Sequence, residues 1–162
     1  MKPKMQSFIQ GLGYPVEKPN SSAEILYGMV WLADYAQRRV AQVLKPFHLT
    51  PVKLNYLMIV KHIGGPEGIA PQEITKRLLM DTGNVTHYLD SLERQGWVIR
   101  LKGSPDPRRR LVKMTPKGDQ LLEEVWPVYS VLIEKLASAF PAHSKQQLVQ
   151  AFNRCRDNWV KE

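Results

Sequence analysis

The segment that decides the fold reads VTHYLDSLERQGWVIR and occupies residues 85–100. Its apolar residues, among them Leu89 and Leu92, recur every three or four positions, which places them on one face of a helix. Gly96 is typical of the position just past a helix end, and residues 97–101 have the aromatic and β-branched content of a strand. The segment therefore predicts a helix that is followed closely by a strand.

Downstream of this segment, residues 97–114 predict a β-hairpin with a basic tip. The sequence GSPDP at 103–107 has the chemistry of a turn, and residues 111–114 return as a second strand. Cations at such a tip can contact phosphates or enter a narrow minor groove, although a run of arginines is also common on a solvated face. The cationic side chains that cluster around the tip are Lys102, Arg108, Arg109, Arg110 and Lys113.

Upstream, residues 71–79 predict a helix, which a short break at Met80 and Asp81 joins to a second helix at 82–95. Helix, short turn, helix and basic hairpin is the order of a winged helix-turn-helix, whose second helix reads the major groove. On their own, the outward residues of that second helix also fit an ordinary solvated face, but the neighbouring hairpin favours DNA. These outward residues are Gly83, Asn84, Thr86, His87, Asp90 and Arg94.

The remaining chain is divided into an arm and a helical region. Residues 1–20 are interrupted by prolines and glycines and predict an N-terminal arm without regular structure. Residues 21–46 and 116–162 predict long amphipathic helices that form a dimerisation region. Residues 50–115 form the predicted DNA-binding region. The expected fold class is therefore mainly α, with a small β-hairpin wing and terminal dimerisation helices.

Local signals give further boundaries. Thr50-Pro51 and Thr115-Pro116 each predict a helix start, with a capping side chain followed by proline at the first helical position. Ile69 predicts a short extended segment. Pro127 is expected to kink or break the helix that starts at 116, and Ser144 is expected to open the last helix through a capping box.

The charge of the chain supports a polyanionic partner. Lys and Arg number 23 against 15 Asp and Glu, which gives a net charge of +8 and a pI near 9.7. Residues 72–117 contain ten Lys or Arg and five Asp or Glu, a local net of +5. More than half of the excess positive charge therefore lies in the predicted helix-turn-helix and hairpin.

Other classes of function find little support in the sequence. Cys155 is the one cysteine; it lies on an apolar helix face, which favours a packed thiol over a redox switch. The four histidines show no paired metal spacing, so neither a metal nor a cofactor is expected. No catalytic constellation is recognisable, and the chain is predicted not to be an enzyme. Neither a membrane span nor an export signal is evident, so the cytoplasm is the expected compartment.

The segment 82–118 resembles the MarR family of multiple antibiotic resistance regulators. The likeness lies in VTHYLDSLERQGWVIR at 85–100, in Asp106-Pro107-Arg108 at the hairpin tip, and in VKMTPKG at 112–118. In order of elements it extends over about residues 23–160. Pro107 departs from the family pattern, where a charged or polar residue is common, and should stiffen the wing.

The resemblance implies a homodimer that binds a palindromic operator and is released by a small ligand or an oxidant. By position, Asp106 would orient Arg108, and Arg108 would enter the minor groove from the wing tip. Thr86 and His87 would lie in the major groove. Two other interpretations remain open: a nonspecific, architectural DNA-binding protein, and an interaction module that keeps the fold without binding DNA.

Dimerisation also has support from the residues themselves. The terminal helices carry more apolar surface than a small helix-turn-helix domain can cover, including Trp126, Phe140, Phe152 and Trp159. A monomer with a thick core is the alternative.

An effector pocket is expected between the dimerisation helices and the DNA-binding region, as the resemblance implies. Tyr27, Trp31 and Tyr35 recur every four residues and share one helix face, where they would suit an aromatic or phenolic acid. The candidate pocket adds Arg38, Arg39, His48 and Tyr56. An aromatic stripe of this kind is also common in an ordinary core.

Overall fold

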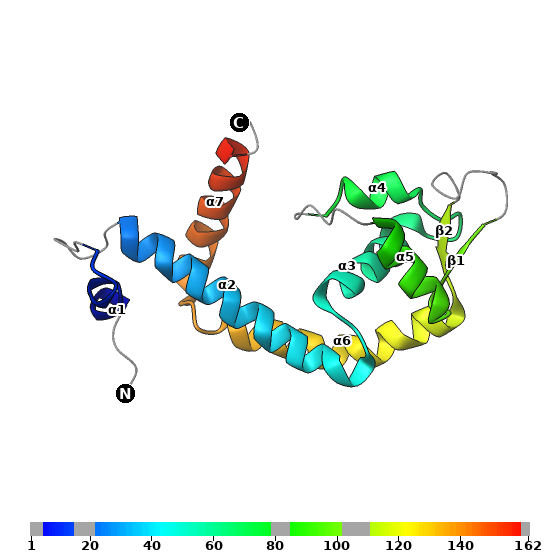
Figure 1. Ribbon diagram of the computed structural model, residues 1–162, viewed down its shortest axis with the longest axis horizontal. Helices are drawn as coiled ribbons and strands as arrows, with labels where there is room; N and C mark the ends of the chain where they lie inside the picture. Colours follow the sequence, from blue (N-terminus) through cyan, green and yellow to red (C-terminus); the bar gives the residue numbers. More distant parts are fainter. Residues whose placement is uncertain (1–4, 15–21, 79–84, 102–110, 160–162) are drawn as a thin grey trace.

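The computed structural model describes residues 5–14, 22–78, 85–101 and 111–159 (Figure 1). Its helices and strands are α1 (Met5–Gly11), α2 (Ser22–Leu44), η1 (Lys45–Phe47), α3 (Pro51–Ile59), η2 (Val60–Gly64), α4 (Pro71–Thr75), α5 (Val85–Arg94), β1 (Val98–Arg100), β2 (Val112–Met114), α6 (Pro116–Ala137) and α7 (Ala142–Trp159). The predicted class, mainly α with one β-hairpin, is confirmed.

The main core lies in a lobe formed by α3, η2, α4, α5, the hairpin and the start of α6. Tyr56 and Leu57 of α3, Leu89 and Leu92 of α5, and Trp97 before β1 are all buried there. Apolar residues spaced for one helix face thus meet the inward side of the hairpin, as the helical periodicity of α5 predicts.

The hairpin is antiparallel, with Val98 opposite Met114 and Arg100 opposite Val112. The predicted extended segment at Ile69 is confirmed, because the amide of Ile69 donates to the carbonyl of Val112 at 2.9 Å and the reverse bond measures 2.8 Å. Gly68 has φ +85°, and a Cβ there would lie 2.9 Å from the Val112 oxygen. Only glycine permits this close approach to the hairpin.

Both predicted Thr-Pro helix starts are confirmed. The Thr50 hydroxyl accepts a bond from the amide of Lys53 at 3.2 Å. The Thr115 hydroxyl accepts from the Gly118 amide at 3.0 Å and donates to the carbonyl of Gly96 at 2.7 Å. Thr115 therefore caps α6 and fastens it to the turn after α5.

The two long helices α2 and α6 lie side by side, and α7 projects away from the lobe (Figure 1). Large apolar side chains on these helices remain exposed, including Ile25 at 58 % and Val131 at 67 %. No side chain that the structure describes in α7 is buried. The helical region therefore presents much apolar surface that a single protomer leaves uncovered.

The prediction of an irregular arm over 1–20 is wrong in part, because Met5–Gly11 forms helix α1. Gly11 is the last residue of this helix, and Gly13, with φ +85°, follows it. Between the breaks, however, α1 packs against α2 and Ile9 is fully buried. A contact with a helix that starts eleven residues later stabilises α1, and local composition did not reveal it.

Three other local predictions differ from the structure. Helix α6 continues unbroken through Pro127, because Val125 and Leu132 are buried on either side of it and hold both halves in place. Helix α4 ends at Thr75 rather than near residue 79, and tighter turns follow it. Ser144 does not cap α7: its hydroxyl donates to the Pro141 carbonyl at 2.9 Å from inside the helix.

Candidate nucleic-acid interface

Helix α5 presents a polar face on the side opposite the core. Leu89 and Leu92 are buried, whereas Thr86, His87 and Arg94 are exposed. The polar residues lie near the start and end of the same outward face, as expected for a recognition helix. Two further candidates of this helix, Gly83 and Asn84, lie outside the described residues.

The wing tip also lies outside the described residues, and with it Lys102, Asp106, Arg108, Arg109 and Arg110. The structure does describe the base of the wing, where Arg100 ends β1 and Lys113 lies in the middle of β2.

Arg100 joins the wing to the recognition helix, a role that the sequence did not indicate. One guanidinium nitrogen lies 2.6 Å from a carboxylate oxygen of Asp90, and another pairs with Glu93. The backbone amide of Arg100 also donates to Glu93 at 3.1 Å. The Arg100 side chain is only 11 % exposed, whereas the side chains of Asp90 and Glu93 are 50 % and 39 % exposed, so a mostly buried guanidinium links β1 to the solvent-facing side of α5.

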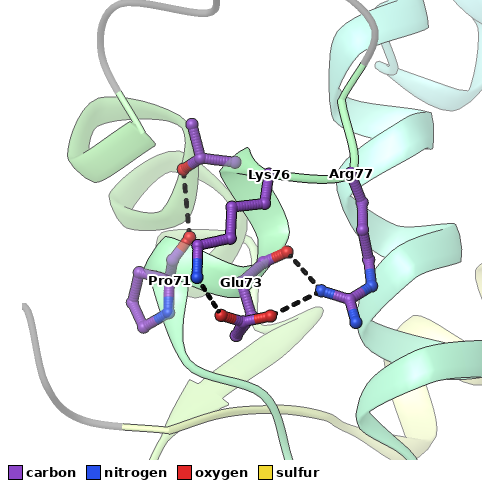
Figure 2. Close-up of polar contacts among 5 residues, drawn as sticks. Pro71, Glu73, Lys76 and Arg77 are labelled. Carbon is purple, nitrogen blue, oxygen red and sulfur yellow. Dashed lines mark hydrogen bonds and ion pairs between the residues drawn. The ribbon is translucent and has the colours of Figure 1, made fainter.

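A second charged group lies at the end of α4, where Glu73 is placed between two cations (Figure 2). The Lys76 ammonium is 2.7 Å from one carboxylate oxygen, and the Arg77 guanidinium is 2.8 Å from the other. The hydrogen bonds from Lys76 and Arg77 lower the pKa of Glu73 below its ordinary value. These residues were not among the candidates predicted from the sequence, although their i, i+3 and i, i+4 spacing is typical of ion pairs on a helix.

A cavity of about 410 Å³ opens between α4, α5 and β1. The start of the recognition helix and α4 both line this cavity, and Arg100 of β1 lines its remaining side. Its lining residues are Pro71, Gln72, Thr75, Val85, Thr86, Leu89, Asp90 and Arg100.

The candidate effector residues fall into two environments. The rings of Trp31 and Tyr35 stack at 5.5 Å on α2, and Tyr27 packs against Tyr14 at 5.4 Å. Tyr56, in contrast, is fully buried in the lobe and packs against Tyr88. Trp31 and Tyr35 are therefore brought together, Tyr27 instead pairs with Tyr14, and Tyr56 belongs to the core of the lobe.

The three polar candidates lie in the second half of α2 and beyond it, and Arg39 donates to the side chain of Gln42 at 2.8 Å. Arg38 is exposed and pairs with Asp34 on the same helix. His48 is exposed and adopts a left-handed conformation with φ 56° after η1. A further cavity, of about 590 Å³, lies between the α3–η2 segment and α6 and is lined in part by Met58, His62 and Trp126.

The described part of the chain also bears on metal binding and membrane insertion. No group of three or more histidine, cysteine or acidic side chains gathers there in a way that could hold a metal ion. None of the helices that the structure describes combines the length and the apolar character that crossing a membrane requires. Cys155 is a free, half-buried thiol.

Comparison with known proteins identifies the same arrangement elsewhere. The model of the MarR family matches residues 49–110. The transcriptional regulator YkoM of Bacillus subtilis, itself described as uncharacterised, is 33 % identical over 85 residues, which is 52 % of this chain and 54 % of YkoM. The multiple antibiotic resistance protein MarR of Salmonella typhimurium is 34 % identical over 87 residues, 54 % of this chain and 58 % of that protein. The chain thus spans about half the length of these curated relatives.

Solved structures extend the likeness to most of the chain. A mutant of MarR from E. coli in complex with operator DNA is 26 % identical, with a TM-score of 0.69, and the match covers 78 % of this chain and 89 % of that one. The organohalide-sensing regulator RdhR in its 2,4-dichlorophenol-bound form has a TM-score of 0.74 at 16 % identity, covering 90 % of this chain and 86 % of RdhR. The helix that follows α4, the hairpin and the long flanking helices have the arrangement found in these proteins, and over residues 49–110 the chain is similar to the MarR family of winged helix-turn-helix regulators.

Proposed function

We propose that this protein is a homodimeric transcriptional repressor of the cytoplasm that binds a palindromic operator. The observation that carries the proposal is the outward face of α5, where Thr86 and His87 are exposed while Leu89 and Leu92 anchor the helix in the core. Threonine and histidine side chains can hydrogen-bond base edges or phosphates in the major groove.

The wing supplies the second half of the proposed contact. Because Arg100 pairs with Asp90 and Glu93, α5 and β1 are held as one unit. In our proposal Asp106 orients Arg108, which enters the minor groove, while Lys102, Arg109 and Arg110 contact phosphates. Gly83 and Asn84 would approach the DNA at the start of the recognition helix. The MarR mutant solved with operator DNA supports this assignment by its likeness.

The proposed dimer uses residues 21–46 and 116–162. The exposed apolar side chains of α2, α6 and α7 support it, because surface of this extent is typical of an interface. Two copies related by twofold symmetry would present two recognition helices to two half-sites of a palindrome. No catalytic step belongs to this function.

Release by a small aromatic or phenolic ligand completes the proposal. The α2 stripe of Tyr27, Trp31 and Tyr35 is the candidate site, with Arg38 and His48 as polar partners. The cavity between the α3–η2 segment and α6 is lined by none of these residues and is a second place where a ligand would touch both the lobe and a long helix. RdhR, which was solved with 2,4-dichlorophenol bound, is a fold relative.

The test is selection of bound fragments from genomic DNA by the purified protein, compared with Arg108→Ala and with Arg156→Ala. Arg156 is an exposed arginine of α7 that pairs with Asp157, so its removal changes the net charge equally. We expect one palindromic site, lost or much weakened in Arg108→Ala and retained in Arg156→Ala. Selection without any enriched sequence would exclude a specific operator and leave the architectural or interaction role.

The same selected fragment tests the effector. Small phenolic acids and 2,4-dichlorophenol are added to the preformed complex, and the melting temperature of the free protein is measured with each compound. Release of the DNA together with a raised melting temperature supports the effector site. If neither changes, the ligand part of the proposal is wrong while the operator part stands.

A further inference from the structure

The charged group at the end of α4 consists of Glu73, Lys76 and Arg77, named here the α4 cluster. Each oxygen of the Glu73 carboxylate has its own cation, at 2.7 Å and 2.8 Å. Arg77 also donates to the Glu73 carbonyl at 2.9 Å, which fixes its guanidinium beside the helix. The two cations are nevertheless open to solvent, with side chains 70 % and 42 % exposed.

Helix α4, which contains Glu73 and is followed directly by Lys76 and Arg77, lies beside the start of the recognition helix, although none of these three side chains lines the cavity between the two helices. Gln72 and Thr75 of α4 line the same cavity as Thr86 of α5, so the two helices border one opening. In a helix-turn-helix, the helix that precedes the recognition helix crosses the sugar-phosphate backbone while the second helix is in the groove. Lys76 and Arg77, which are exposed directly after the end of α4, would therefore lie close to a DNA strand that crosses this helix.

Glu73 presents to these cations the same chemistry that a phosphate would present. Two anionic oxygens accept hydrogen bonds from an ammonium and a guanidinium, as two phosphate oxygens would. Pairs between exposed side chains are weak because water and salt screen them, so a DNA phosphate can replace the carboxylate. While Glu73 stays in place, however, the cluster carries a net charge of +1 instead of +2.

We propose that Lys76 and Arg77 form a phosphate-binding surface on α4, and that Glu73 positions these cations while holding their affinity for the DNA backbone below its full value. The ligand is the phosphodiester backbone of duplex DNA, read without regard to sequence. The inference rests on the proposed function and adds to it a charge that tunes DNA binding from outside the recognition helix and wing.

The test measures binding of a fluorescent duplex by anisotropy over a series of KCl concentrations. Two duplexes of equal length are used, one carrying the selected fragment and one of random sequence. We expect Glu73→Gln to tighten binding to both duplexes by roughly three- to tenfold at low salt, with a steeper dependence on salt, because about one more phosphate is neutralised. Lys76→Gln should weaken binding to both duplexes by a similar factor. It should also reduce the slope of log affinity against log salt concentration by about one.

Opposite effects of these two variants separate the proposal from a merely structural role. Both substitutions break the same ion pair, so a structural role would change DNA affinity in the same direction in both. Glu73→Gln without any change in affinity, or with weaker binding, would overturn the proposal. A change confined to the selected fragment would also overturn it, because contacts with the backbone cannot distinguish sequences.

Asp34→Asn provides the matched control. Asp34 pairs with Arg38 at the same i, i+4 spacing on α2, and its neutralisation raises the net charge by the same amount. We expect no change in DNA affinity; a gain equal to that of Glu73→Gln would reduce the effect to net charge and overturn the proposal. If the wild-type protein shows no preference for the selected fragment, the proposed function fails, yet the effects of Glu73 and Lys76 on random DNA still test the α4 cluster.

Discussion

Among single residues, Gly118 has the most restricted surroundings of the glycines that the structure describes. A Cβ built on it would lie 2.2 Å from the carbonyl oxygen of Trp97 and 2.5 Å from the sulfur of Met114. Helix α6 is therefore seated directly on the base of the hairpin. Gly28 in α2 is the opposite case, since a Cβ there would meet nothing within 4 Å of the protomer.

This contrast predicts opposite effects for the same substitution. Gly118→Ala should lower the free energy of unfolding by about 2–3 kcal/mol, because the backbone of Trp97 cannot move aside without displacing the hairpin. Gly28→Ala should raise it by up to about 1 kcal/mol, since alanine is the better helix former. Urea denaturation of both variants measures the difference, and equal stabilities would show that α6 does not press on the hairpin as described.

Among the helices and strands, the sequence predicted those that depend on neighbours along the chain. The Thr-Pro starts, the hairpin and the outward face of α5 follow from caps, turns and periodicity, which act within a few residues. The pairing of Arg100 with Asp90 and Glu93 depends on where the strand lies relative to the helix, which spacing alone cannot give. The helix α1 was missed for the same reason, because its stability comes from packing on α2.

The uninterrupted course of α6 leads to a prediction about the stability of the protein. Pro127 lacks the amide that a helix interior requires, and proline there costs about 3 kcal/mol relative to alanine. Pro127→Ala should therefore raise the free energy of unfolding by about 1–3 kcal/mol. Pro141→Ala, just before α7, is the control and should bring no such gain. Thermal and urea unfolding test both; a less stable Pro127→Ala would mean that the ring makes packing contacts worth more than the lost hydrogen bond.

For the whole molecule, the exposed apolar side chains of the long helices lead to a prediction about the oligomeric state. Val131 on α6 is 67 % exposed, and Ile99 on the wing strand is 45 % exposed. If two copies pair through the long helices, as proposed, Val131→Glu places a charge in the interface and should yield monomers. Ile99→Glu adds the same charge outside that region and should leave the dimer intact. Sedimentation velocity distinguishes the species, and a dimer that persists in Val131→Glu would place the interface elsewhere.

The attachment of α6 to the hairpin has a mechanical consequence. Its 22 residues make a rod roughly 33 Å long. One end is fastened through Thr115 and Gly118, and the rod then runs beside α2. A tilt of about 5° at the far end would carry the wing end through roughly 3 Å, close to the step of about 3.4 Å from one base pair to the next. In the proposed complex with DNA, a slight tilt of α6 at the end far from the DNA would therefore displace the wing by about one base step.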